Sequence, residues 1–273
     1  AAAPSLTQFF LSLNSAFDAS DILIGGRSVP ALAAGASSSA STTVTIPEGT
    51  ATGNWYIIAK ADGQGVVTET SETNNTYATA IKIGPDLDIT ALSVPATSGA
   101  GENIAVTDTT KNQGGSAAAP SLTQFFLSLN SALDASDTLI GGRSVPALAA
   151  GASSSASTTV TIPEGTATGN WYIIAKADGQ GVVTETSETN NTYAAAIKIG
   201  PDLDITALSV PAASGAGENI SVTDTTKNQG GGAAAPSLTQ FFLSLNSAFD
   251  ASDILIGGRS VPALAAGASS SAS

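Results

Sequence analysis

The 273-residue sequence contains no cysteine, methionine or histidine. Disulfide bonds are therefore impossible, and zinc, haem and iron-sulfur centres lose their usual side-chain ligands. Membrane-spanning helices need about 18 or more consecutive apolar residues, and no stretch of this sequence reaches that length. The composition thus excludes a disulfide scaffold and offers no membrane span within these residues.

Basic residues are also scarce. The chain has 9 Lys and Arg against 22 Asp and Glu, a net charge of -13, and charged residues make up only 11% of it. Nucleic acids are bound by clustered Lys and Arg side chains, which contact phosphates, and no such cluster occurs here. We therefore expect no nucleic-acid partner, and we expect the acidic surface to keep neighbouring copies soluble.

A long internal repeat dominates the sequence. The segment that begins at residue 1 returns at 117 and 233, a period of 116 residues, and it reads AAAPSLTQFFLSLNSA. A fixed period of this length indicates one domain per repeat. We expect a complete unit at 85–200, a partial unit at 1–84 that lacks the first two strands, and a partial unit at 201–273 that lacks the last strands. The copies are nearly identical, so we interpret the chain as a segment of a longer array.

Each unit predicts an all-β sandwich. Short segments of alternating apolar and polar residues are separated by Gly, Pro, Asn and Asp, and no segment keeps a helical period over ten residues. The seven strands expected in the complete unit cover residues 86–94, 104–111, 122–129, 139–145, 157–162, 170–177 and 192–199.

The alternation also predicts the core. Phe125 and Leu127 share one face of the third strand, and Trp171 and Ile173 share one face of the sixth. Large aromatic side chains supply much of the apolar area that a small domain buries. We therefore expect Phe125, Leu127, Trp171 and Ile173 to lie in the core of the sandwich.

One acidic residue breaks this pattern. Asp108, with its copy Asp224, has the inward parity of Ile104 and Val106, and a buried carboxylate is costly unless it is paired. The favoured interpretation is a strand that twists and leaves Asp108 in water. Two alternatives remain: an acid beside an intramolecular Lys-Asn isopeptide bond, or an ion pair with a nearby lysine, for which the candidates are Lys111, Lys176 and Lys198.

Five segments of the unit carry a family resemblance: PDLDITALSVP, GENIAVTDTTKNQGG, LTQFFLSLNSALDASDTLIGGRSVPAL, TIPEGTATGNWYIIAKAD and VVTETSETNN. Together they cover nearly the whole unit and resemble the CARDB domain, the cell-adhesion-related domain found in bacteria and archaea. The resemblance implies tandem immunoglobulin-like seven-stranded β-sandwiches, one per repeat, on large secreted or surface proteins. The family usually has an apolar residue at the position of Asp108, which makes that acid a departure. A family fold does not identify a ligand.

Two acidic clusters are candidate calcium sites, because calcium takes six to eight oxygen ligands in flexible geometry. The first cluster contains Asn130, Asp134 and Asp137. The second contains Asp178, Glu185, Glu188 and Asn190. The alternative interpretation is structural: such side chains close turns through backbone hydrogen bonds, and Glu185 and Asn191 can tie a hairpin together.

A catalytic role is not expected. Paired carboxylates such as Glu185 and Glu188 carry out glycoside hydrolysis in some enzymes, but here they recur in repeated copies without a groove-building insertion. We expect a non-enzymatic structural segment of an extracellular or cell-surface fibre, stalk or filament, without cofactor unless calcium binds. Its partners would be identical repeats and neighbouring copies of itself. The alternative is an adhesin module that binds a host or matrix ligand through its loops.

Overall fold

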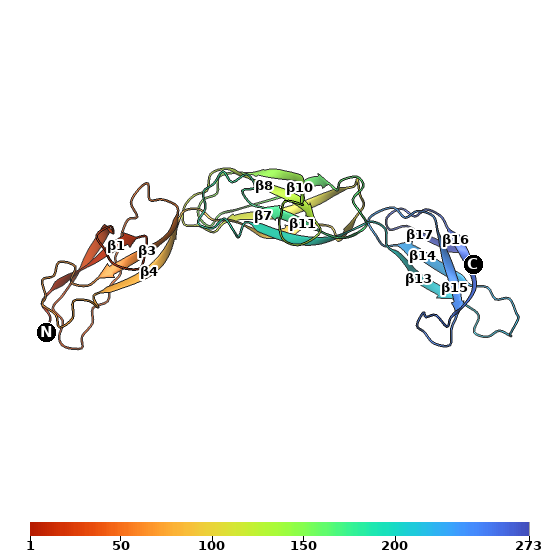
Figure 1. Ribbon diagram of the computed structural model, residues 1–273, viewed down its shortest axis with the longest axis horizontal. Helices are drawn as coiled ribbons and strands as arrows, with labels where there is room; N and C mark the ends of the chain where they lie inside the picture. The colour runs from red at the N-terminus through yellow and green to blue at the C-terminus, as the bar shows by residue number, and fades with distance from the viewer. Residues whose placement is uncertain (273) are drawn as a thin grey trace.

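The computed structural model describes residues 1–272 and shows three all-β bodies that follow one another along the chain. Figure 1 shows them end to end, with the N-terminus and the C-terminus at opposite ends. The first body holds β1 to β4, the second β5 to β12 and the third β13 to β17. Residue 273, the last position of the third predicted unit, lies outside the described residues.

The middle body is a sandwich of two sheets. One sheet has the strand order β10-β7-β5 and the other β6-β12-β11-β8-β9. All seven predicted strands are present, which confirms the all-β fold class. The strands are β5 (Leu87–Ser93), β6 (Thr97–Ser98), β7 (Asn103–Asn112), β8 (Ser121–Ser128), β9 (Thr138–Val145), β10 (Ser153–Thr161), β11 (Gly169–Lys176) and β12 (Thr192–Ile199).

The structure differs from the prediction at β6 and β10. The turn expected after β5 contains β6, whose two residues pair in parallel with Lys198 and Ile199 at the end of β12. Strand β10 begins at Ser153, inside a segment expected to be a connection, because β7 offers it an unbroken partner from Asn103 to Lys111. Pairing between distant segments decides both cases, since the local Ser- and Ala-rich sequence has no strong strand preference.

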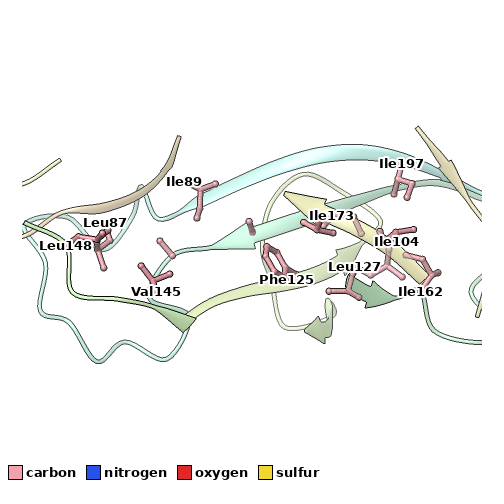
Figure 2. Close-up of a cluster of buried hydrophobic side chains, with 14 of the residues drawn as sticks. Leu87, Ile89, Ile104, Phe125, Leu127, Val145, Leu148, Ile162, Ile173 and Ile197 are labelled. Carbon is pink, nitrogen blue, oxygen red and sulfur yellow. The ribbon is translucent and has the colours of Figure 1, made fainter. Parts of the chain in front are cut away.

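The core lies between the two sheets of the middle body. Phe125, Leu127 and Ile173 are all buried there, and Figure 2 shows them facing side chains from the opposite sheet. Trp171 differs from the expectation because it is only partly buried and packs at the rim of the core. Its indole Nε1 donates to the carbonyl oxygen of Ala167 at 2.9 Å, so its polar edge stays at the surface while its ring covers the sandwich.

The first body is a single sheet of order β2-β1-β3-β4. Residues 37–45 have the same sequence as β10 but form no strand. The counterpart of β7 is not part of this body, so β10 depends on its partner rather than on its own sequence. The four strands are β1 (Ser5–Ser12), β2 (Ile22–Val29), β3 (Gly53–Lys60) and β4 (Thr76–Ile83).

The third body contains two small sheets, of order β13-β14-β17 and β15-β16. Its first strand is exposed along its whole length, whereas the equivalent β5 is largely buried at its start. The strands are β13 (Leu203–Ser209), β14 (Thr223–Asn228), β15 (Ser237–Leu243), β16 (Ile254–Val261) and β17 (Ser269–Ala272).

Candidate functional site

The joint that enters the middle body is a short linker held by backbone hydrogen bonds. Gly84, Pro85 and Asp86 are all buried. The carbonyl oxygen of Gly84 accepts from the N–H of Gly115 at 2.9 Å, and that of Asp86 accepts from the N–H of Gln113 at 2.7 Å. Gly84 has a φ of 128°, a conformation that favours glycine. The linker is therefore fixed to the turn that follows β7.

Asn112, at the end of β7, is the centre of this turn. Its side chain is fully buried. Its Oδ1 accepts from the N–H of Asp86 at 3.1 Å and of Gly114 at 3.0 Å. Its Nδ2 lies within hydrogen-bond distance of three backbone carbonyl oxygens, those of Ser116 (2.7 Å), Leu148 (3.0 Å) and Ala149 (3.3 Å). Asn112 thus connects the linker to two loops.

Sequence reasoning did not single out Asn112. In the sequence it is an ordinary residue shortly before a Gly-Gly turn, and nothing in the local pattern indicates its role. Asn228 repeats the arrangement in the third body: its Oδ1 accepts from the N–H of Asp202 and of Gly230, and its Nδ2 donates to the Gly232 carbonyl oxygen at 2.8 Å.

A loop of the same body covers the linker from the other side. We call residues 178–191, between β11 and β12, the clasp loop. The N–H of Thr186 donates to the carbonyl oxygen of Pro85 at 2.9 Å, and Asn190 Nδ2 donates to Asp86 Oδ1 at 3.0 Å. The N–H of Leu87 donates to Glu185 Oε2. The second acidic cluster of the sequence is therefore hydrogen-bonded to the first residues of the middle body.

The second joint is more exposed than the first. Pro201 and Asp202 repeat Pro85 and Asp86, but no clasp loop lies over them within the described residues, and both are exposed. Leu203 is 40% exposed, whereas its counterpart Leu87 is 0% exposed. The described part of the third body also contains no counterparts of β11 and β12, which pack against β5 in the middle body. The burial of the linker and of Leu87 therefore depends on the clasp loop together with these two strands.

Glu185 is a buried acid of the clasp loop with a raised pKa. Its side chain is buried, and burial raises its pKa to about 7. The hydrogen bond from Leu87 N–H opposes this increase, while the charges of Glu188, Asp178 and Asp86 add to it. Asn191 Nδ2 donates to Glu185 Oε1 at 3.0 Å, which is the contact that the structural alternative to a calcium site predicts.

The second joint adds a direct contact between bodies. On the middle body, the N–H of Gly200 donates to the Ser98 carbonyl oxygen at 2.9 Å and that of Lys198 to the Ala96 carbonyl oxygen at 3.0 Å, and these bonds hold the turn at residues 96–98 beside the end of β12. A glycine loop of the third body lies against this turn, and a Cβ on Gly231 would overlap the backbone of Ser98. The close approach of the two bodies therefore requires glycine at this position.

Asp108 is buried, with 0% exposure, so the expectation that its strand leaves it in water is wrong. Its partner is Arg143 on β9 and none of the three lysines proposed. Arg143 Nε donates to Asp108 Oδ1 at 2.6 Å and its Nη2 to Asp108 Oδ2 at 2.7 Å. Nη2 also donates to the Ser154 carbonyl oxygen at 2.8 Å. One guanidinium thus joins β7, β9 and β10, and Asp108 sits beside Arg143 rather than beside a lysine and an asparagine.

The same pair recurs in the third body. Arg259 contacts both carboxylate oxygens of Asp224, Oδ2 at 2.8 Å, and this bonding holds the pKa of Asp224 below its ordinary value despite burial. The signal for this pair was in the sequence. Arg143 has the inward parity of Val145, which makes it an inward cation on the sheet opposite an inward acid.

The first acidic cluster closes its own loop. Asp134 Oδ1 accepts from the N–H and the hydroxyl of Ser136, at 2.7 and 2.6 Å. Asp137 Oδ2 accepts from the N–H of Asp134 at 2.8 Å, and Asn130 Oδ1 from the N–H of Ala132 at 2.8 Å. The two bonds from Ser136 lower the pKa of Asp134. The cluster therefore has the turn-closing arrangement that was the alternative to calcium.

The clasp loop uses its oxygens in a similar way. Asp178 Oδ2 accepts from the N–H of Val183 at 2.8 Å, and Glu188 Oε1 from the N–H of Glu185 at 3.0 Å. Across residues 1–272, no group of three or more acidic side chains is arranged to hold a metal ion. The calcium hypothesis thus gains no support from the geometry of either cluster.

Within the same residues, no helix has the length and apolarity to cross a membrane.

Comparison with known proteins gives one family. The CARDB family model matches residues 10–79 and 84–195. No curated protein matches the chain at a significant level.

Three solved structures illustrate what the chain is similar to. The CARDB domain of the PF1109 protein from Pyrococcus furiosus, crystallised in complex with di-metal ions, is 21% identical, with 42% of this chain and 94% of that domain covered and a TM-score of 0.34. A domain of a candidate cell surface protein from Methanosarcina acetivorans is 21% identical, with 43% and 93% covered and a TM-score of 0.33. A β-glucosidase from Listeria innocua is 16% identical, with 45% and 17% covered and a TM-score of 0.31. The first two are matched almost whole, whereas the match takes in a small part of the enzyme.

Proposed function

Because the chain belongs to the CARDB family, we propose that it is a non-catalytic structural segment of an extracellular fibre, stalk or filament on a bacterial or archaeal surface. Its partners are identical repeats along the chain and neighbouring copies of itself. Each sandwich acts as a rigid bead, and the joints set the angle between beads.

The observation that carries this proposal is that the joints are held by hydrogen bonds and packing contacts. The linker at Gly84 to Asp86 is buried and hydrogen-bonded to the turn after β7 on one side and to the clasp loop on the other. A flexible tether would be exposed and free of such bonds. At the second joint, the contact of Gly231 with Ser98 adds direct packing between bodies. A chain built in this way transmits orientation from one repeat to the next.

The arrangement of the acidic side chains supports a non-catalytic role. Glu185 accepts from Leu87 N–H and Asn191, and Glu188 accepts from the N–H of Glu185. A general acid or nucleophile must instead reach a substrate atom. Both carboxylates hold the fold together in the middle body, and Glu69 and Glu72 repeat them in the first body.

The contact between the second and third bodies provides the test. We expect Gly231→Ala to force the bodies apart, because the added methyl group overlaps the Ser98 backbone. Small-angle X-ray scattering of the whole chain should show a changed maximum dimension, while the thermal unfolding of each body stays nearly the same.

Gly257→Ala is the matched control, because a Cβ at Gly257 on β16 meets no atom within 4 Å. It should leave the scattering profile as in the wild type. If Gly231→Ala and Gly257→Ala gave the same profile, the second joint would not be a packed contact and the proposal of rigid joints would fail.

A further inference from the structure

Glu185 is a buried acid at the point where the clasp loop meets the linker. Its Oε2 accepts from the N–H of Leu87, the first residue of β5, and its Oε1 accepts from Asn191 Nδ2. The bond to Leu87 joins residues 98 positions apart in the sequence. The protonation state of this one carboxyl group therefore acts directly on the segment that connects two repeats.

The charges around Glu185 disfavour its ionised form. The acids that face it are Glu188 and Asp178 from the clasp loop and Asp86 from the linker. Lys82 of β4, which is exposed, places its Nζ 3.8 Å from Asp86 Oδ2. Among the described residues, no Lys or Arg forms an ion pair with Glu185. An ionised Glu185 thus places a negative charge at a buried position beside three other acids, with little compensation.

The site can accommodate the neutral form. A protonated carboxyl group needs an acceptor for its hydrogen, and Asn191 Oδ1 is buried without a hydrogen-bond partner in residues 1–272. The Asn191 amide already lies 3.0 Å from Glu185 Oε1. Turning this amide over would place its oxygen against the proton of Glu185, so the hydrogen bond between the two side chains would be kept, with its direction reversed, while the negative charge is removed.

We propose that Glu185 is a proton-controlled latch on the joint between repeats. With a neutral carboxyl group, the clasp loop holds the linker and the two repeats keep one orientation. When the group ionises, repulsion from the neighbouring acids opens the clasp loop, the N–H of Leu87 loses its partner, and the joint loosens.

The direction of the pH effect follows from the two states of the latch. In the closed latch the pKa of Glu185 is raised from 4.5 to about 7, whereas an open, solvated glutamate has its ordinary value. Because the pKa is higher in the closed latch than in the open one, binding of the proton favours the closed latch. This stabilisation is complete below about pH 4.5 and is lost as the pH rises through about 7. The array would be stiffer in weakly acidic than in alkaline surroundings. This inference extends the proposed function, since it regulates the same joint.

Amide hydrogen exchange of Leu87 in the whole chain tests the latch. The exchange rate, measured by NMR and divided by the intrinsic rate at each pH, gives the fraction of time that the N–H is open. We expect the opening of Leu87 to rise by at least about tenfold between pH 5.5 and pH 8.5. The absence of histidine removes the side chains that ordinarily titrate in this range.

Two variants complete the test. Glu185→Gln keeps the shape without the titration, so it should leave Leu87 protected to the same extent at both pH values. Glu69→Gln makes the same change at the equivalent position of the first body, where no linker passes, and should retain the wild-type pH dependence. A wild-type Leu87 that is equally protected at both pH values would refute the latch, as would Glu185→Gln that keeps the dependence. Either result would leave the rigid-joint proposal standing, because that proposal is tested by scattering at one pH.

Discussion

Arg143→Ala should lower the free energy of unfolding of the middle body by about 3–5 kcal/mol, because it leaves the buried Asp108 carboxylate without its partner. Asp108 is 0% exposed, so water cannot replace the two hydrogen bonds from the guanidinium. The change also removes the bond to the Ser154 carbonyl oxygen, which ties β10 to β9. Urea unfolding followed by the fluorescence of Trp171, in a Trp55→Phe background, measures the effect.

Arg27→Ala is the matched control. Arg27 is the same residue in the first body, where it bonds to Ser38 at 3.1 Å from Nη1 and 2.8 Å from Nη2 but has no acidic partner within the described residues. It should leave the unfolding of the middle body unchanged. The double variant Asp108→Leu with Arg143→Leu should recover much of the loss, since it removes both charges. A loss below about 1 kcal/mol in Arg143→Ala would mean that the pair is hydrated like a surface ion pair.

Asn112→Asp should destabilise the same body by more than about 3 kcal/mol at pH 7. The change is nearly isosteric, but it replaces the Nδ2 donor with an oxygen that faces the carbonyl oxygens of Ser116, Leu148 and Ala149. The loss should be smaller near pH 4, where the new carboxyl group is partly protonated. Urea unfolding at the two pH values provides the measurement.

Asn170→Asp provides the comparison, because Asn170 is an exposed residue of β11. It makes the same chemical change at the surface and should alter stability by less than about 0.5 kcal/mol. Equal losses of stability in the two variants would contradict the role of Asn112 as the residue that connects the linker to two loops.

The sequence predicts most of the strands because they carry their own alternation of apolar and polar residues. It does not predict β6, since two residues gain strand geometry only by pairing with the end of β12. Residues 37–45 and 153–161 make the same point, because one sequence is a strand in one body and not in another. Local sequence decides where strands can form, and partners decide which of them do.

The site was less predictable for the same reason. The parity of Asp108 indicates its inward direction, but its partner Arg143 lies 35 residues away on another sheet. The clasp loop was recognised as an acidic cluster, and calcium was a reasonable hypothesis for its residue types. Its contacts with the linker join segments about 100 residues apart, and no local pattern encodes them. The turn chemistry of Asp134 and Asp137, by contrast, is local and was anticipated.

The strand lengths and the joints together determine the length that each repeat adds to an array. Strands of about eight residues span roughly 25 Å, so a sandwich with its loops adds on the order of 40 Å per repeat. A fixed angle at each joint turns this increment into a defined shape for an array. Near-identical copies are then an advantage, since every joint presents the same surfaces.

The distance between equivalent positions in neighbouring bodies tests the central claim most directly. The chain has no cysteine, so spin labels can be placed on Ala31→Cys, Ala147→Cys and Ala263→Cys, which are exposed and equivalent. Pulsed electron paramagnetic resonance on the pairs 31/147 and 147/263 should give one narrow distance distribution each, centred on the order of 40 Å. Broad distributions, of the width expected for domains on flexible tethers, would contradict the account of rigid joints.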